Sequence, residues 1–202
     1  MKYAIEIENL TKNYGKHRGV DSIDLCVKEG EWFGFIGPNG AGKSTTIRTL
    51  LGLIKPTKGE SRVFGLDSWK ESERIMEGIG YLPSEAIFYP EMSVKETLDY
   101  ALSFFKNKDK RRQEELCERF QLDTKRKVGE LSYGNRKKVG IVSALQHSPS
   151  LLILDEPTGG LDPLMQREFF NVLEEEHKKG KTIFMSSHIL SEIEHHAETA
   201  AF

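Results

Sequence analysis

The strongest chemical signal in the sequence lies at residues 37–44, which read GPNGAGKS and fit the phosphate-binding pattern GxxxxGK(S/T) at every fixed position. An apolar run at 32–36 precedes this loop and a helical pattern at 45–53 follows it, as such a loop requires. Glycines let backbone N–H groups approach a triphosphate closely. Lys43 would bring a positive charge to the β and γ phosphates, and Ser44 a hydroxyl to Mg²⁺, at the positive end of the helix. The loop therefore predicts binding of a nucleoside triphosphate.

A second signal is the pair of neighbouring carboxylates, Asp155 and Glu156, which follows the apolar run 151–154. In parallel α/β sheets, ligands bind beyond the carboxyl ends of the strands. Two adjacent carboxylates are costly there without a cation, so Asp155 is interpreted as a Mg²⁺ ligand, directly or through water. Glu156 is interpreted as the group that orients or deprotonates an attacking water. Together with the loop, these residues predict hydrolysis of the triphosphate.

Length and charge limit the possible classes of protein. The chain has 202 residues, enough for one substantial α/β core or for one core with a smaller subdomain. Its 29 basic and 31 acidic residues give a formal net charge of −2, which offers no argument for an acidic partner. We therefore expect no nucleic-acid partner. Basic clusters at 16–18, 106–112, 125–127 and 136–138 are interpreted as solvated faces.

Cysteine usage and hydropathy indicate the compartment. Cys26 and Cys117 are far apart and lack metal-ligand spacing, which favours a reducing, cytosolic setting. No apolar run approaches the length of about 18 residues that a membrane span needs, and the N-terminus lacks the layout of a secretory signal. We expect a soluble chain that would reach a membrane only through a partner.

The apolar patterns predict the order of the elements. Strands are expected at 4–8, 20–27, 32–36, 58–64, 79–82, 151–154 and 182–185, and helices at 45–53, 68–76, 164–177 and 189–196. The first two strands alternate apolar with polar residues and are predicted to be antiparallel. Between Pro83 and Pro149 the pattern becomes helical, and Ser93 with Glu96 forms a capping box ahead of a helix that runs to Phe105. Residues 84–149 are therefore interpreted as a helical insertion in an α/β core.

Taken together and in this order, the motifs resemble the nucleotide-binding subunit of an ATP-binding cassette (ABC) protein, most of all the transporter ATPases. The most specific element is LSYGN at 131–135, where the family carries its LSGGQ signature. Tyr133 and Asn135 depart from that signature, whereas Ser132 and Gly134 are retained. The resemblance assigns this retained pair to the γ-phosphate, and a hydroxyl with an N–H group at a helix N-terminus suits an anion.

The resemblance implies further site residues. Tyr14 takes the place of the aromatic residue that stacks on adenine, and Gly160, Leu161 and Asp162 resemble the D-loop between paired subunits. His188 matches the switch histidine that holds the γ-phosphate and the water. The Q-loop glutamine is missing: Ser84 stands in its place as a candidate Mg²⁺ ligand, followed by Glu85. The residues expected around the nucleotide are Tyr14, Gly37, Pro38, Asn39, Gly40, Ala41, Gly42, Lys43, Ser44, Thr45, Ser132 and Gly134.

The resemblance also implies an architecture and a role. We expect a single α/β domain over residues 1–202, a P-loop NTPase core with a mostly parallel sheet, an N-terminal antiparallel β subdomain and a helical subdomain at 84–149. The implied role is an ATP-hydrolysing subunit that uses Mg²⁺ and powers a membrane exporter, similar to the bacitracin-type and antimicrobial-peptide branch. Implied partners are a second nucleotide-binding subunit, arranged head to tail, and a transmembrane permease at the inner face of the cell membrane.

Two alternatives remain open. One is a soluble ABC ATPase that acts on DNA or on the ribosome, although neither a long coiled-coil insertion nor a second cassette is present. The other is a regulatory module that binds ATP with little turnover, which the changes at Ser84 and Tyr133 favour. The sequence stops at Phe202 inside an expected strand, which suggests a truncated C-terminus. The histidines without an assigned role are expected to be solvated: His17, His147, His177, His195 and His196.

Overall fold

The strands form two sheets in the computed structural model, which describes residues 2–15 and 17–201. The first sheet contains β1 (Tyr3–Tyr14), β2 (His17–Lys28), β4 (Lys58–Val63) and β5 (Leu66–Asp67). The second contains β3 (Trp32–Ile36), β6 (Ile79–Leu82), β7 (Leu151–Asp155), β8 (Thr182–Ser187) and β9 (Thr199–Ala201). The first is antiparallel in the order β2-β1-β4-β5, and the second is parallel in the order β6-β7-β8-β3-β9. The predicted α/β class and its antiparallel N-terminal part are confirmed.

Burial patterns explain the two kinds of sheet. β3, β7 and β8 are buried at every position, because the parallel sheet is covered on both faces. β1 mixes buried and exposed positions, as a sheet with one solvated face requires. β1 and β2 extend beyond the predicted ranges, since their hairpin continues through several bulges to the pair Tyr14 and His17. Lys16, the side chains of His17 and Arg18, and Phe202 lie outside the described residues, so the predictions made for them stay predictions.

The helices are α1 (Lys43–Leu50), α2 (Ser72–Met76), α3 (Val94–Ser103), α4 (Lys110–Arg119), α5 (Tyr133–Leu145), α6 (Pro163–Lys178) and α7 (Leu190–His196). The capping box is confirmed: Ser93 Oγ accepts from the Glu96 N–H at 3.2 Å, and Glu96 Oε2 accepts from the Ser93 N–H at 2.8 Å. α2 begins later than predicted, because the Asp67 carboxylate accepts the N–H groups of Trp69 and Lys70 and forms a turn there. None of the helices in the described part of the chain is both long and apolar enough to cross a membrane.

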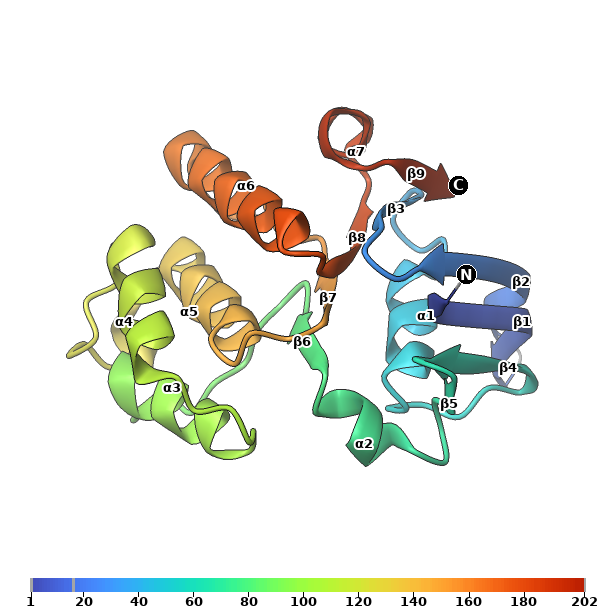
Figure 1. The fold of residues 1–202 in the computed structure, drawn as a ribbon, viewed down its shortest axis with the longest axis horizontal. Coiled ribbons are helices and arrows are strands. Elements are labelled where there is room, and N and C mark those ends of the chain that lie inside the picture. Colours follow the sequence, from blue (N-terminus) through green and yellow to red (C-terminus); the bar gives the residue numbers. More distant parts are fainter. Residues whose placement is uncertain (1, 16, 202) are drawn as a thin grey trace.

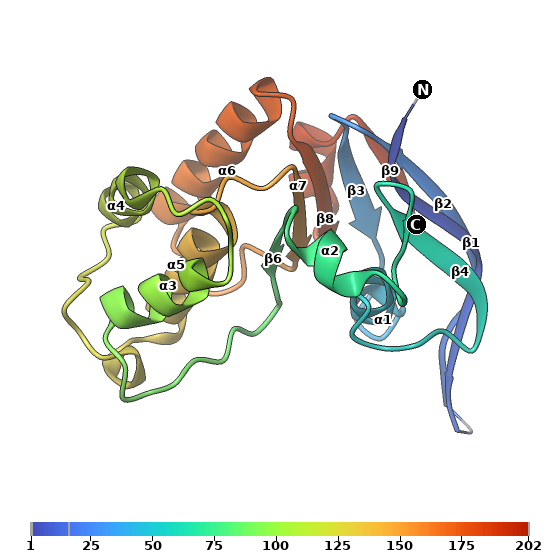
Figure 2. The same ribbon diagram turned by 60° about the horizontal axis from the view of Figure 1, so that its bottom comes forward.

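Two apolar cores lie on the two faces of the parallel sheet. Figure 1 shows the inserted helices and α6 to one side of this sheet, and α1 with the antiparallel sheet to the other. One core lies between the two sheets, where α1 contributes Ile47 and Leu50. The other lies on the opposite face, where α3, α4, α5 and α6 are grouped (Figure 2). This second core joins Leu98 of α3 and Phe120 to Leu154 of β7, so the inserted helices and the sheet share one continuous core. The division of residues 84–149 as a separate subdomain remains a prediction.

The histidine prediction is wrong for His147, whereas His177 and His196 are partly exposed. His147 is only 4% exposed, stacks on Phe105 with ring centroids 3.6 Å apart, and its Nε2 lies 3.0 Å from the Ile79 carbonyl oxygen. His196 stacks on Phe170 with centroids 4.0 Å apart. The His147 ring fills apolar space, where an imidazole packs as an aromatic group, whereas Nδ1 of His196 lies 3.6 Å from Glu174 Oε1. Burial lowers the pKa of His147 to about 4, so this ring is neutral near pH 7.

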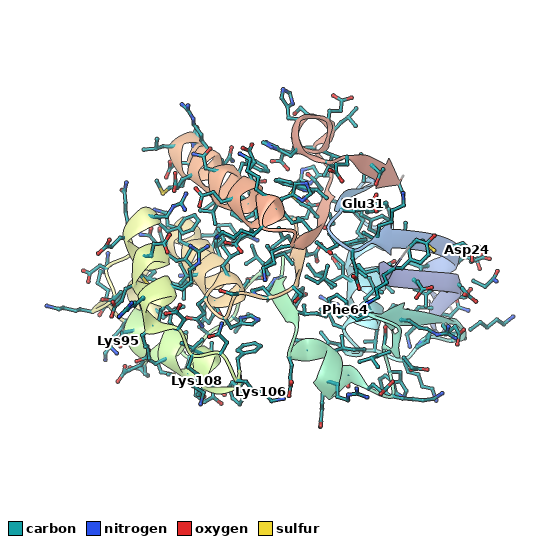
Figure 3. All side chains as sticks on the ribbon, viewed as in Figure 1. Asp24, Glu31, Phe64, Lys95, Lys106 and Lys108 are labelled. Atoms are coloured by element: carbon teal, nitrogen blue, oxygen red, sulfur yellow. The ribbon has the colours of Figure 1, made fainter. Side chains whose placement is uncertain are left out.

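The basic clusters divide into exposed and buried sets. Lys106 and Lys108 lie on the outer surface of the inserted helices (Figure 3), as predicted for a solvated face. The prediction is wrong for residues 136–138, because Lys137 is 2% exposed and Lys138 is 9% exposed. α5 turns both side chains inward from its first turns. Lys137 is buried because its ammonium donates to backbone carbonyl groups of the candidate active site.

Candidate active site

The loop between β3 and α1 borders a cavity of about 410 Å³. The cavity is lined by Tyr14, Gly19, Asn39, Gly40, Gly42, Lys43, Ser44, Thr45, Ser84 and Glu156. Gly37, Pro38 and Ala41 line a neighbouring hollow together with Lys43. The predicted loop residues, Tyr14 and Ser84 therefore meet at one place, although they come from distant parts of the sequence.

Gly42 is required by the way the loop closes. Its φ is 95°, a left-handed conformation that side chains rarely adopt, and a Cβ there would stand 2.5 Å from the Gly19 carbonyl oxygen and also meet Val20. The loop is thus fitted against the start of β2. α1 begins directly after Gly42, so its N-terminal N–H groups face the cavity.

Lys43 lies at the base of the cavity and is 6% exposed. Its Nζ donates to the carbonyl oxygens of Gly37 at 2.5 Å and Pro38 at 3.2 Å, and lies 3.2 Å from Glu156 Oε1. A single ammonium therefore connects the loop to the carboxylate after β7. A buried positive charge held this way can attract an anion at the mouth of the loop.

Asp155 ends β7 and is held by two hydroxyl groups. Ser44 Oγ donates to its Oδ2 at 2.7 Å, and Ser186 Oγ donates to its Oδ1 at 2.6 Å. Sequence reasoning did not assign a role to Ser186. The strand register pairs Asp155 with Ser186. Both residues directly follow a predicted strand, at 151–154 and 182–185, and this shared position was the signal that could have found Ser186.

Glu156 occupies a strained turn. Its φ is 48°, in the left-handed region, and its N–H group donates to the carbonyl oxygen and the Oγ of Ser186, each at 3.2 Å. Its Oε2 lies 2.7 Å from Nδ1 of His188, which follows β8. The structure thus brings together the predicted general base and the predicted switch histidine, with Lys43 on the other carboxylate oxygen.

Lys137 is a buried residue of the site that sequence reasoning missed. Its Nζ donates to the carbonyl oxygens of Pro83 at 3.1 Å, Ser84 at 2.9 Å and Glu156 at 3.0 Å. Burial lowers its pKa to about 8, although the charges of Asp155 and Glu156 act in the opposite direction. Helical periodicity could have indicated its burial, since the buried Ile141 lies one turn further along the same face.

Ser132 and Gly134 do not line the cavity of their own chain. Ser132 caps α5, where its Oγ accepts from the Asn135 N–H at 3.3 Å, and its side chain is exposed. Tyr133 lies against the backbone of Gly160, and its hydroxyl donates to the Ser84 carbonyl oxygen at 3.5 Å. Ser132 is therefore open to solvent, Gly134 is half-buried against the Gly160 backbone, and the Tyr133 ring is 47% exposed while one side of it lies on Gly160.

The donor set at the loop fits Mg²⁺. Within residues 2–15 and 17–201, no group of three or more His, Cys, Asp or Glu side chains could hold a metal ion. Ser44 and Asp155 offer a hydroxyl and a carboxylate close together, 2.7 Å apart at their nearest oxygens. Mg²⁺ favours such hard oxygen donors, and it is commonly held by one or two protein groups together with substrate phosphates.

Comparison with known families identifies the origin of this arrangement. The sequence model of the family described as ABC transporter matches residues 20–159. The bacitracin transport ATP-binding protein of Bacillus licheniformis is 43% identical over 197 residues, which cover 96% of this chain and 64% of that protein. The linearmycin resistance ATP-binding protein of Bacillus subtilis (strain 168) is 35% identical over 94% of this chain and 63% of that protein. This chain spans less than two thirds of the length of these curated relatives.

Solved structures agree with the fold. A structure described as the ATP-binding subunit of an ABC transporter matches with a TM-score of 0.90 and 31% identity, covering 96% of this chain and 83% of that chain. A dimeric bacterial ABC transporter cassette matches with a TM-score of 0.83 and 26% identity, covering 93% of this chain and 89% of that chain. The cavity around Lys43 is thus set in a fold shared with proteins that are described as binding ATP.

Proposed function

The chain belongs to the ABC transporter family, and we propose that it is a nucleotide-binding subunit that hydrolyses ATP to power a membrane transporter of the export type. The observation that carries this proposal is the convergence of Lys43 and His188 on the two carboxylate oxygens of Glu156. A carboxylate held between a lysine and a histidine, beside a phosphate-binding loop, is suited to act on a water next to the terminal phosphate.

The proposed reaction uses each group differently. Backbone N–H groups of the loop between β3 and α1 and of the α1 N-terminus bind the phosphates, and Lys43 neutralises charge that develops as the γ-phosphoryl group leaves. Glu156 accepts a hydrogen bond from the attacking water or takes its proton, and His188 fixes the direction of the carboxylate. Tyr14, exposed at the edge of the cavity, offers its ring to the adenine.

Mg²⁺ is the proposed cofactor. Ser44 and Asp155 would hold it, and Ser84 lies close enough to line the same cavity. The ion would supply charge neutralisation between the β and γ phosphates. The hydroxyl of Ser186 fixes the second oxygen of Asp155, so the carboxylate is already oriented before a ligand arrives.

A second copy or a similar subunit is the proposed partner across the cavity. Ser132 is exposed at the N-terminus of α5, and neither Ser132 nor Gly134 lines the cavity of its own chain. In a single chain, the residues of the LSYGN segment do not reach the nucleotide cavity. In a head-to-tail pair, the LSYGN segment of each subunit would complete the cavity of the other. The relative described as a dimeric cassette supports this arrangement.

A transmembrane permease is the proposed second partner. Large apolar and aromatic side chains are exposed in the segment after Ser84, on α3 and directly after α3: Ile87, Tyr89, Tyr100 and Phe104. Ile87 is 87% exposed, and Tyr100 packs edge-on against both Tyr89 and Phe104. Clustered exposed apolar groups are typical of an interaction surface. This surface continues into the loop that lines the cavity, so contact there could pass to the nucleotide.

The direction of transport is proposed from the relatives. The curated relatives include proteins named for bacitracin transport and linearmycin resistance, which favours export of an antimicrobial compound. The cytosolic, membrane-peripheral location follows from this role. The cargo would be bound by the permease rather than by this chain.

Phosphate release from the purified protein with ATP and Mg²⁺ tests the proposal. Glu156→Gln should lower kcat by about 100-fold or more while ATP still binds and stabilises a dimer. Glu77→Gln is the matched control, because Glu77 is exposed and pairs with Lys106. Equal turnover by Glu156→Gln and the parent would refute the role of Glu156. Tight ATP binding without turnover by the parent would instead favour the regulatory module.

A further inference from the structure

We propose that Lys137 is a positioning residue for the hydrolysis assigned above: it holds the Ser84 loop and the turn of Glu156 at a fixed distance, so that the placement of α5 sets the direction of the Glu156 carboxylate. The inference rests on the proposed function. It concerns a residue that does not line the cavity at the phosphate-binding loop.

The Lys137 ammonium is fully hydrogen-bonded and joins two loops of the site. An ammonium has three donors, and here all three are used, on the carbonyl oxygens of Pro83, Ser84 and Glu156 at 2.9 to 3.1 Å. Two of these acceptors follow β6 and the third follows β7. The side chain is 2% exposed, so water cannot replace the lysine at these carbonyl groups.

The turn at Glu156 is the reason that this junction matters. A non-glycine residue at a φ of 48° is strained, and such a conformation persists only where its surroundings fix it. Ser186 holds the N–H group on one side of the residue, and Lys137 holds the carbonyl group on the other. Loss of the Lys137 contact would free one of the two peptide groups that aim the side chain at His188.

Tyr133 supports the same junction from one turn earlier on α5. Its hydroxyl reaches the Ser84 carbonyl oxygen, which Lys137 also binds, and its ring lies on Gly160. The tyrosine that replaces glycine in the family signature therefore makes contacts within its own chain, with Ser84 and Gly160. Tyr133 and Lys137 together connect α5 to both loops that border the cavity.

Lys137→Met tests the proposal, since methionine keeps much of the length of the side chain and removes all three donors. We expect kcat to fall by about 10-fold to 100-fold, because a small misplacement of a catalytic group has that effect, while ATP affinity changes by less than about threefold. Lys138→Met is the matched control: it removes the neighbouring buried lysine and should leave kcat within about twofold. An unchanged kcat in Lys137→Met would overturn the proposal.

A double-mutant cycle separates positioning from general damage. If Lys137 acts through Glu156, adding Lys137→Met to Glu156→Gln should cause no further loss in single-turnover rate, whereas independent effects would multiply and would overturn the proposal. Lys137→Gln keeps a donor and should recover part of the lost kcat. If Lys137→Met fails to fold, Lys137→Gln takes its place in the same cycle. The phosphate-release assay on the parent protein tests the proposed function separately. Absence of turnover there would refute the proposed function, not the role of Lys137 alone.

Discussion

Protonation of His147 at acid pH should lower the folding stability of the chain, because this buried ring packs between Phe105, which follows α3, and the Ile79 carbonyl group of β6. The acceptor at Ile79 places the ring proton on Nε2, and Nδ1 is buried with no hydrogen-bond partner among the described residues. A second proton would therefore create a charge without an acceptor inside the core. The pKa falls from 6.5 to about 4, chiefly because of burial, and the nearby positive charge of Lys181 adds to the effect.

The sign and size of the effect follow from proton linkage. The unfolded chain takes up a proton near pH 6.5 and the folded chain only near pH 4, so stability is present above pH 6.5 and is lost as the pH falls towards 4. The whole difference corresponds to about 3 kcal/mol. Between pH 7.5 and pH 5, the loss from this one residue is about 2 kcal/mol.

Urea unfolding at several pH values measures this loss. His147→Gln cannot titrate, and its amide can still donate to the Ile79 carbonyl group, so it should be less stable than the parent at pH 7.5 yet lose less stability on acidification. The difference between the two slopes isolates His147 from other acid-sensitive groups such as His196. Parallel slopes for the parent and His147→Gln between pH 7.5 and pH 5 would show that His147 is not the source.

Three further outcomes are expected at the site. Lys43→Ala should weaken ATP binding by about 100-fold, and unchanged affinity in a fluorescent-nucleotide titration would contradict the loop assignment. Gly42→Ala should destabilise the chain by about 2 kcal/mol or more in thermal unfolding, because the new Cβ meets Gly19 in a left-handed turn, and an unchanged Tm would count against this. Ser186→Ala should raise the Mg²⁺ concentration needed for half-maximal turnover about 10-fold, and an identical Mg²⁺ titration would remove Ser186 from the site.

The parts of the site that follow directly from strands and loops were predictable from the sequence. The loop at 37–44 and the carboxylates at 155–156 each follow an apolar run, and parallel strands bring their carboxyl ends to one edge. His188 directly follows β8, which is parallel to β7, so it lies at the same edge of the sheet. Strand order alone therefore explains why residues far apart in sequence line one cavity.

The sequence analysis missed polar residues that the fold buries, because such side chains are usually exposed. Lys137 was interpreted as solvated because it stands in a basic cluster, yet the helical period of α5 turns it towards the carbonyl groups after β6 and β7. His147 was interpreted as solvated because it had no assigned role, yet it lies just after α5, is buried and packs as an aromatic ring. The contact between Tyr133 and Ser84 could not be predicted, because it depends on how the inserted helices pack against the sheet.

The core shared by the inserted helices and the sheet bears on folding cooperativity. Leu98 and Phe120 lie in one apolar cluster with Leu154 and Ile183, so opening α3 and α4 would admit water to the strands behind the site. We expect amide hydrogens of α5 and β7 to exchange at closely similar free energies, and a clearly lower value for α5 would argue against a single unit. The insertion would then be no detachable module, and its deletion would unfold the nucleotide site as well.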